Sequence, residues 1–283
     1  MNIISKPVRF IKSNLIYRMT GLFSEVNIET YGYCNRQCSF CFNNQKYPQR
    51  EIGIMDEETF RKIVDELGDL DFSGRVGLHH YGEPLLDKRL AKFVKYVRKK
   101  CPKSFIEIAS NVDYLNEDKL KELVNAGLNR ILGTNYDDAR KMEMEKLAKK
   151  YPKNFTYRSY KNLNIVNRAG GIFNYKSNLI NKKCERPSNF LVINWKGDVI
   201  LCCDDYYSNY IFGSVRKNSI IQIWYSEKFQ EIRKILKKES GRTKIEMCKN
   251  CDDISYQFGI LKDLILSIRN RISNFFKGKI KNT

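Results

Sequence analysis

The stretch of residues 30–44 reads TYGYCNRQCSFCFNN and contains Cys34, Cys38 and Cys41 in a C-x3-C-x2-C spacing. Three thiolates this close in sequence can bind three irons of one iron–sulfur cube, and the fourth iron is then left without a protein ligand. A structural zinc site needs four ligands, and neither a fourth cysteine nor a histidine lies near this stretch. The spacing therefore favours a cluster with one open iron over half of a split zinc site or three unrelated cysteines in a reduced core.

The same stretch, with Phe40 directly before its last cysteine, resembles the signature of radical S-adenosylmethionine (SAM) enzymes. In that family the amino and carboxylate groups of SAM chelate the open iron, and the reduced 4Fe–4S cluster cleaves SAM to a 5′-deoxyadenosyl radical. The resemblance implies an enzyme that binds SAM and receives electrons from an external one-electron donor such as flavodoxin or ferredoxin.

Strands and helices are expected to alternate between residues 24 and 160, because apolar residues recur there at helical spacing between short β-type runs. Repeated βα units form a parallel sheet whose ligands lie at the carboxyl ends of the strands. We therefore predict an α/β fold. The family resemblance implies an open, partial (β/α) TIM-type barrel, here one repeat short of the usual six. The expected strands are 24–30, 75–80, 104–110, 129–135 and 154–160.

The turn after the second expected strand resembles the GGEP motif of radical SAM enzymes, with Tyr81 in place of the first glycine. In the family this motif holds the amino group of SAM, and a glycine lets the chain pass close to the ligand. The end of the third expected strand resembles positions that bond the ribose of SAM. An ordinary turn is the alternative at both places. The resemblance assigns to SAM the residues Phe40, Tyr81, Gly82, Glu83, Pro84, Ser110 and Asn111.

Four more cysteines follow the expected barrel, and residues 190–203, FLVINWKGDVILCC, predict a hairpin between them. A helical stretch then leads to a C-x2-C pair. Such a set could form a zinc ribbon, but it also resembles the SPASM and Twitch domains of radical SAM proteins, which hold an auxiliary 4Fe–4S cluster. Four thiolates saturate one cluster, so two clusters are implied in all. The proposed auxiliary ligands are Cys184, Cys202, Cys248 and Cys251.

The net charge of +19 attracts phosphates, nucleic acid or anionic lipid. A nucleic-acid-binding module has no use for an open cluster beside a Gly-Glu-Pro turn, which favours an enzyme. Nine cysteines indicate a reducing compartment, and no apolar run is long enough to cross a membrane, so we expect a cytoplasmic protein. The basic, apolar ends of the chain either pack on the core or attach the protein peripherally to an anionic membrane.

These features divide the chain into four expected parts. They are a basic N-terminal arm at 1–23, the radical SAM partial barrel at 24–165, a SPASM or Twitch domain with a β-hairpin and helix at 166–254, and a basic amphipathic C-terminal helix at 255–283.

Two further residues bear on the reaction. Arg168 lies between the barrel and the cluster domain, where a guanidinium suits a phosphate, a carboxylate or a polyhydroxylated ring. We interpret it as a catalytic residue, with a structural clamp as the alternative. Cys203 follows Cys202 on the expected hairpin and therefore points to the opposite face. It is either a small buried hydrophobic residue or a hydrogen-atom donor.

The expected reaction is oxidation of an alcohol of a small polyol, sugar or aminocyclitol to a ketone, with the auxiliary cluster as electron acceptor. The resemblance favours this reaction because peptide-modifying relatives usually carry a separate peptide-binding domain and more auxiliary clusters. The alternatives are a sugar epimerase that uses a cysteine as hydrogen donor, and a peptide-modifying SPASM maturase.

Overall fold

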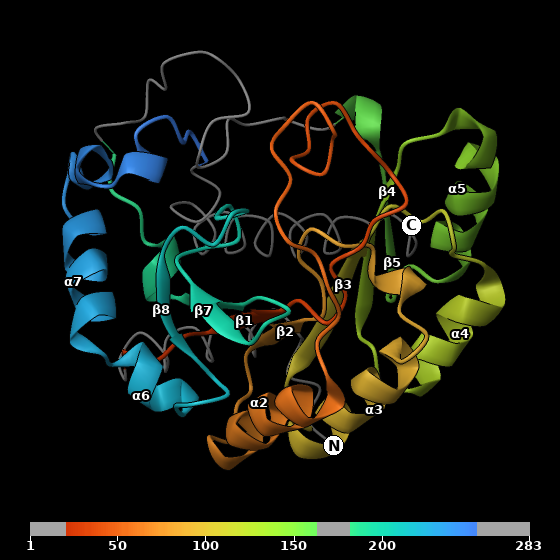
Figure 1. Cartoon of the computed structure of the whole chain (residues 1–283). Coiled ribbons are helices and arrows are strands. Elements are labelled where there is room, and N and C mark those ends of the chain that lie inside the picture. Colours follow the sequence, from red (N-terminus) through yellow and green to blue (C-terminus); the bar gives the residue numbers. More distant parts are fainter. Residues whose placement is uncertain (1–20, 163–181, 254–283) are drawn as a thin grey trace, which may run out of the picture.

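The computed structural model describes residues 21–162 and 182–253 of the chain (Figure 1). Most of the expected N-terminal arm, Arg168 and the whole of the expected C-terminal helix lie outside these residues.

The described residues form one eight-stranded sheet in the order β5-β4-β3-β2-β1-β6-β7-β8. The first five strands run parallel, and an α-helix follows each of the first four. The sheet stays open, so the predicted α/β fold with a partial barrel is confirmed. These elements are β1 (Glu25–Ile28), α2 (Glu57–Asp69), β2 (Arg75–Gly77), α3 (Leu90–Lys100), β3 (Phe105–Ser110), α4 (Glu117–Asn125), β4 (Arg130–Asn135), α5 (Lys141–Lys150) and β5 (Phe155–Ser159).

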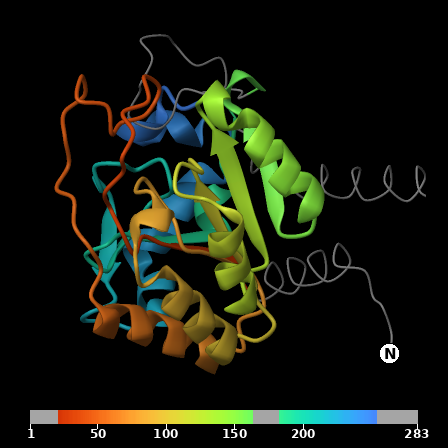
Figure 2. The same cartoon turned by 90° about the vertical axis from the view of Figure 1, so that its right-hand side faces the viewer.

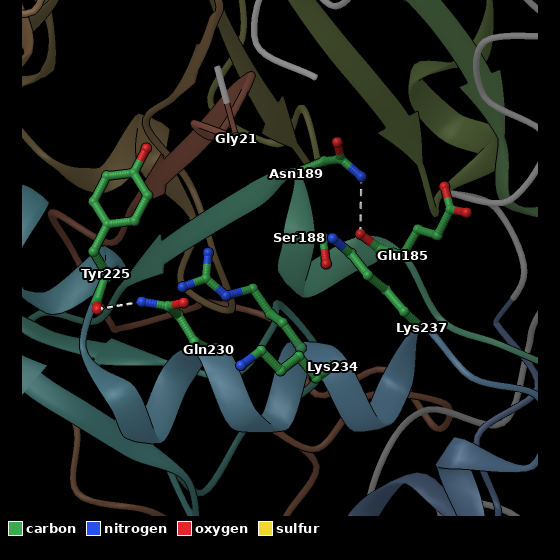
Figure 3. A pocket seen from close by; sticks show the side chains of 9 residues that line it. Gly21, Glu185, Ser188, Asn189, Tyr225, Gln230, Lys234 and Lys237 are labelled. Atoms are coloured by element: carbon green, nitrogen blue, oxygen red, sulfur yellow. Dashed lines mark hydrogen bonds between the residues drawn. The ribbon is translucent and has the colours of Figure 1, made fainter. Parts of the chain in front are cut away.

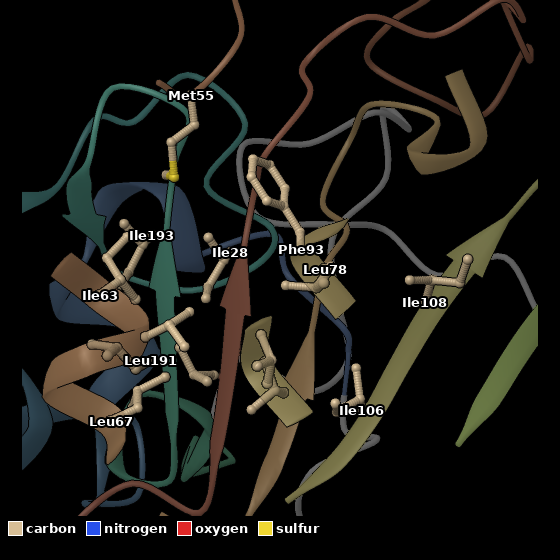
Figure 4. Packing of buried hydrophobic residues seen from close by; sticks show 14 of the residues in the cluster. Ile28, Met55, Ile63, Leu67, Leu78, Phe93, Ile106, Ile108, Leu191 and Ile193 are labelled. Atoms are coloured by element: carbon tan, nitrogen blue, oxygen red, sulfur yellow. The ribbon is translucent and has the colours of Figure 1, made fainter. Parts of the chain in front are cut away.

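The helix α2 shows why these segments fold where the sequence predicts. Asp56 caps its first turn by accepting the N–H of Thr59 at 2.8 Å. Figure 4 shows Ile63 and Leu67 of α2 on the side of the helix that faces Leu191 in the sheet. Full burial of a side chain of this size contributes about 1.5–3 kcal/mol, so packing outweighs intrinsic helix propensity. The fully buried apolar residues of α2 are Phe60, Ile63, Val64 and Leu67.

The predicted hairpin is present, and its strands extend the sheet of the barrel. Its first strand, β6 (Phe190–Ile193), pairs in parallel with β1 and antiparallel with β7 (Asp198–Ile200). A further strand, β8 (Ile211–Ser214), pairs with β7. All four residues of β6 are buried, which explains why this strand reads as a continuous apolar run. The second cysteine set is therefore anchored on the same sheet as the first.

The helical stretch expected after the hairpin consists of two helices, α6 (Ile220–Trp224) and α7 (Glu227–Leu236). Ser219 and Gln222 form a capping box at the start of α6. Arg233 of α7 stacks on the ring of Trp224, with its guanidinium carbon 4.0 Å from the ring centroid. Its guanidinium also donates to the carbonyl of Trp224 at the end of α6, and these contacts hold the two helices together.

The carboxyl ends of the parallel strands define the end of the molecule where the cysteine loop lies. Figure 2 shows the loop after β1, in orange-red, beyond the same end of the sheet as the last described segment, in blue. Within the residues that the model describes, no helix has the length and apolar character needed to cross a membrane.

Candidate active site

A cavity of about 330 Å³ lies at the carboxyl ends of the first strands. The three cysteines of the loop line it, and so do all the positions that the sequence assigns to SAM except Pro84. Pro84 is buried and opens a short 3-10 helix, η1 (Pro84–Leu86). The lining residues predicted from the sequence are Cys34, Cys38, Cys41, Phe40, Tyr81, Gly82, Glu83, Ser110 and Asn111.

The loop that carries the three cysteines is held at its base and turns tightly at its tip. The N–H of Gly32 donates to the Gly53 carbonyl at 2.9 Å, which joins the two ends of the loop. At the tip, the N–H of Cys41 donates to the Cys38 carbonyl at 3.0 Å. All three thiols are partly buried. The loop therefore presents three thiols to one cavity without burying them completely.

The electrostatics of this loop disfavour the thiolate form of its cysteines unless a cation is bound. Burial raises the pKa of the Cys34 thiol to about 11, and the neighbouring Glu83, Cys41 and Cys38 add to the rise. Three thiolates beside a carboxylate repel one another unless a cation is present. Iron would displace these protons, because a thiolate is the metal-binding form of cysteine. The donor set of three thiols beside an open cavity fits a 4Fe–4S cluster with one open iron.

The Gly-Glu-Pro turn packs directly against the start of the cysteine loop. A Cβ atom on Gly82 would lie 1.9 Å from the carbonyl oxygen of Tyr31, so only glycine fits. The N–H of Glu83 donates to the Tyr33 carbonyl at 2.8 Å. Tyr81, which replaces the first glycine of the family motif, packs edge-on against Tyr206 with ring centroids 4.7 Å apart. This departure from the motif thus fills the space between the loop and the segment after Cys202.

Glu83 is fixed by the end of β3. Its carboxylate is buried and accepts the hydroxyl of Ser110 at 2.7 Å and the N–H of Asn111 at 2.8 Å. Burial raises the pKa of Glu83, although these hydrogen bonds oppose the rise. The side chain of Asn111 also donates to Asn35 at 2.8 Å, beside Cys34. Glu83, Ser110 and Asn111 are therefore joined to one another and to the cysteine loop by hydrogen bonds.

Several residues that line the cavity were not predicted from the sequence, and the polar and aromatic ones include Arg36, His80, Tyr136 and Arg158. Arg36 is held by Asp113, with Nε 2.6 Å from Oδ2, and lies 5.6 Å from the centroid of the Tyr136 ring. Arg158, on β5, makes no ion pair with any described residue and projects a free positive charge at the cavity. His80 has its Nε2 3.1 Å from the carbonyl oxygen of Cys203. Their place at or after the carboxyl ends of predicted strands is the signal that could have found them.

The four cysteines of the second set line one small pocket of about 20 Å³. Three separate segments supply them. The N–H of Cys184 donates to the carbonyl of Leu236 at the end of α7, at 2.7 Å, and Cys202 follows β7. Cys248 ends the 3-10 helix η6 (Glu246–Cys248), and the N–H of Cys251 donates back to its carbonyl at 3.2 Å. Long-range packing therefore assembles this site.

The thiols of the second set sit in a low-dielectric environment. Burial raises the pKa values of Cys202 and Cys248 well above the usual range, and that of Cys251 to about 12. Among the described residues, no three His, Cys, Asp or Glu side chains lie close enough to enclose a single metal ion. A cube of four irons holds its cysteines farther apart than one zinc ion does. Four buried or half-buried thiols around a closed pocket fit such a cube.

A separate cavity of about 420 Å³ lies beside α7 (Figure 3). Its lining includes three basic residues, Arg233, Lys234 and Lys237, one acidic residue, Glu185, and uncharged residues. Neither cysteine set lines it, so it lies apart from both sites.

Comparison with known proteins identifies the class. The radical SAM superfamily model matches residues 28–174, and the SPASM iron–sulfur cluster-binding domain matches residues 184–252. The chain therefore belongs to the radical SAM superfamily. It is a radical SAM enzyme whose cofactors are SAM and two 4Fe–4S clusters.

Particular relatives are also close. The chain is 32% identical over 252 residues to the S-adenosyl-L-methionine-dependent 2-deoxy-scyllo-inosamine dehydrogenase of Niallia circulans, covering 88% of this chain and 100% of the relative. The spacing of the four auxiliary cysteines by itself also resembles that of this dehydrogenase. A crystal structure of BtrN in complex with AdoMet and 2-DOIA is 33% identical, with a TM-score of 0.77, and the match covers 83% of this chain and 95% of BtrN. The fold is shared with native anSMEcpe with bound AdoMet, which is 14% identical with a TM-score of 0.56. That match covers 90% of this chain and 99% of anSMEcpe.

Proposed function

We propose that this enzyme is a dehydrogenase that oxidises one alcohol of a small polyol, sugar or aminocyclitol to a ketone. The 2-deoxy-scyllo-inosamine dehydrogenase supports this, because the similarity extends over its whole length. 2-Deoxy-scyllo-inosamine is therefore the first substrate to test.

The observation that carries the proposal is the joining of the two cysteine sites. The loop of the first set follows β1, and β6, which pairs with β1, leads into the hairpin that carries Cys202. His80 lines the first cavity and contacts the carbonyl of Cys203, the residue next to Cys202, at 3.1 Å. Oxidation of a carbinol removes one hydrogen atom, one proton and one electron. Such a reaction needs a radical source and an electron acceptor at fixed positions in the same protein.

The residues of the chain then have distinct roles. When bound, SAM and the two clusters supply a hydrogen-atom abstractor at the first site and a one-electron acceptor at the second. Glu83, fixed by Ser110 and Asn111, orients the amino group of SAM, and Arg158 offers a free cation to an anionic group in the cavity. The proposed ligands of the first cluster are Cys34, Cys38 and Cys41. The proposed ligands of the second cluster are Cys184, Cys202, Cys248 and Cys251.

The hydroxyl proton of the substrate needs a base. We propose Arg168, or a side chain that Arg168 positions, for this role. Support comes from its place in the sequence between the barrel and the cluster domain, since Arg168 lies outside the described residues. Arg168→Lys should lower kcat more than it raises KM for the alcohol, and a variant with wild-type kcat would exclude this role.

Epimerisation by a cysteine hydrogen donor is the alternative reaction. Cys203 is the candidate donor, but it is not among the described residues that line the cavity. Its sulfur instead lies 3.0 Å from Nη1 of Arg186. This orientation favours dehydrogenation over epimerisation.

The two reactions differ in product mass. Anaerobic protein with SAM, dithionite and 2-deoxy-scyllo-inosamine in deuterated water should yield 5′-deoxyadenosine and a product about two mass units lighter than the substrate. A product about one unit heavier would show epimerisation and would overturn the proposed dehydrogenation.

Two partner assignments complete the proposal. A flavodoxin or ferredoxin is the proposed electron donor, since the net charge of +19 favours an acidic protein partner. The basic ends of the chain, outside the described residues, are proposed to give peripheral membrane contact to a cytoplasmic enzyme. Co-flotation with anionic vesicles but not neutral ones would support this contact, and the absence of co-flotation with either would exclude it.

A further inference from the structure

Two buried arginines border the pocket of the four cysteines, Arg186 and Arg242. Arg186 has acidic partners. Its Nη1 lies 3.0 Å from a carboxylate oxygen of Asp204, and its Nη2 lies 2.7 Å from one of Asp253. The positive charge of Arg186 is therefore compensated within the protein.

Arg242 differs from Arg186 in its ion pairing and in the hydrogen bonding of its guanidinium group. It is 1% exposed, yet it forms no ion pair with a carboxylate of the described residues. Its Nη1 donates to the carbonyl of Cys251 at 2.8 Å and its Nη2 to that of Asp253 at 2.9 Å. Its Nε is buried and has no hydrogen-bond acceptor among the described residues.

A buried charged donor without an acceptor is unusual, because its desolvation is not offset. Arg242 cannot easily turn away from the pocket. It sits in the 3-10 helix η5 (Gly241–Lys244), directly after Ser240, whose φ of +58° is left-handed. A Cβ atom on Gly241 would lie 2.1 Å from the carbonyl oxygen of Ile235, so this turn is pressed against the end of α7. The backbone therefore holds an unsatisfied cationic donor at the edge of the four-cysteine pocket.

We propose that Arg242 is a positioning residue for the auxiliary cluster. Its Nε donates a hydrogen bond to the cluster, and its charge and this bond raise the reduction potential of the cluster. A cube bound by four thiolates is anionic, and reduction makes it more negative by one charge. An uncompensated cation and an N–H donor at the sulfurs both stabilise the reduced form more than the oxidised form. Arg186 contributes less, because Asp204 and Asp253 neutralise it.

One consequence rests on the proposed dehydrogenation. A higher reduction potential makes the cluster a better acceptor for the electron that leaves the substrate.

The test measures the potential itself, without SAM or substrate, so it is independent of whether the dehydrogenase assay succeeds. The full chain carrying Cys34→Ala, Cys38→Ala and Cys41→Ala retains only the auxiliary cluster. Redox titration followed by electron paramagnetic resonance then compares Arg242→Gln with this background. We expect at least a tenfold loss in the equilibrium constant of reduction, which is about 59 mV for one electron.

The matched control is Arg233→Gln. Arg233 is also a buried arginine that donates to backbone carbonyls, but it does not line the four-cysteine pocket. Its removal should leave the potential unchanged. An unchanged potential in Arg242→Gln with four irons bound would show that Arg242 only clamps the chain and would overturn the proposal.

A second variant decides the case in which Arg242→Gln does not retain its cluster. Arg242→Lys keeps the charge but loses the Nε donor and the planar fork. A lowered potential in Arg242→Lys supports the proposed hydrogen bond from Nε to the cluster, and a potential equal to that of the background overturns that hydrogen bond.

Discussion

The two cysteine sites of this chain differ in the room that they leave beside the metal ligands. The cavity at Cys34, Cys38 and Cys41 measures about 330 Å³, whereas the pocket at the other four cysteines measures about 20 Å³. The first site can hold a molecule next to three thiols. The second leaves little free space beside its four thiols. On one sheet, free volume therefore distinguishes the site that can hold a substrate-sized molecule from the site proposed for electron transfer.

The difference follows from how each site is assembled. The first set lies within one short loop, whose position depends on its base at Gly32 and Gly53. The second set comes from three segments that lie far apart in the sequence. Arg186 and Arg242 hold these segments together because both donate hydrogen bonds to Asp253. Loss of the first cluster should therefore affect chemistry alone, while loss of the second should also affect folding.

The strongest contrast is expected from Cys38→Ala. With two thiols left in the loop, formation of 5′-deoxyadenosine from SAM and dithionite should fall to the level of a protein-free control. Cys101→Ala is the matched variant, because Cys101 is buried beneath α2 and α3 and belongs to neither site. SAM cleavage by Cys38→Ala at the rate of Cys101→Ala would remove the first site from the chemistry.

Cys248→Ala tests the other half of the comparison. It should leave SAM cleavage in place but abolish the ketone, because the electron acceptor is lost. It should also lower the midpoint of thermal unfolding, since metal binding at a buried site contributes folding free energy. Chromatography of both products and a melting curve measure these effects. Normal ketone yield together with an unchanged midpoint would contradict the assigned roles.

A smaller effect is expected where the Gly-Glu-Pro turn meets the loop. Gly82→Ala places a methyl group against the Tyr31 carbonyl and should cost about 1–3 kcal/mol in the free energy of unfolding. It should also raise KM for SAM, because Glu83 moves with the backbone. Urea unfolding and initial rates measure both. Gly68→Ala within α2 is the control, and equal behaviour of the two variants would argue against a tight turn at Gly82.

The smallest effect should come from a charge outside both sites. Burial is the largest single influence on the half-exposed Asp56 and raises its pKa, but the hydrogen bonds from Thr59 and Arg216 together outweigh burial and lower the pKa to about 2. A lowered pKa stabilises the fold fully above the ordinary value of 3.8, and this stability is lost as the pH falls toward about 2.

Asp56→Asn keeps the helix cap and removes the charge. It should therefore cost at most about 1 kcal/mol, given the exposure of the pair, and the cost should stay constant between about pH 7 and pH 5. Urea unfolding at both pH values measures it. A cost that changes across this range would mean that a different group is titrating.

Much of the fold was predictable because its signals are local. Helical spacing located α2 to α5, and the βα order determined which loops meet at one end of the sheet. Both cysteine sets were predictable from spacing. The pairing of β6 with β1 was not, because it joins residues that lie far apart in the sequence. Arg158 and Arg242 were missed for the same reason, since what distinguishes them is the pocket each one lines.

A single-turnover experiment shows whether the auxiliary cluster accepts the electron that leaves the substrate. The reconstituted enzyme receives one reducing equivalent at its first cluster and is then mixed with SAM and 2-deoxy-scyllo-inosamine. Electron paramagnetic resonance of frozen samples quantifies the reduced auxiliary cluster, and mass spectrometry quantifies the ketone. We expect about one reduced auxiliary cluster for each ketone formed. Ketone formation without any reduced auxiliary cluster would contradict it.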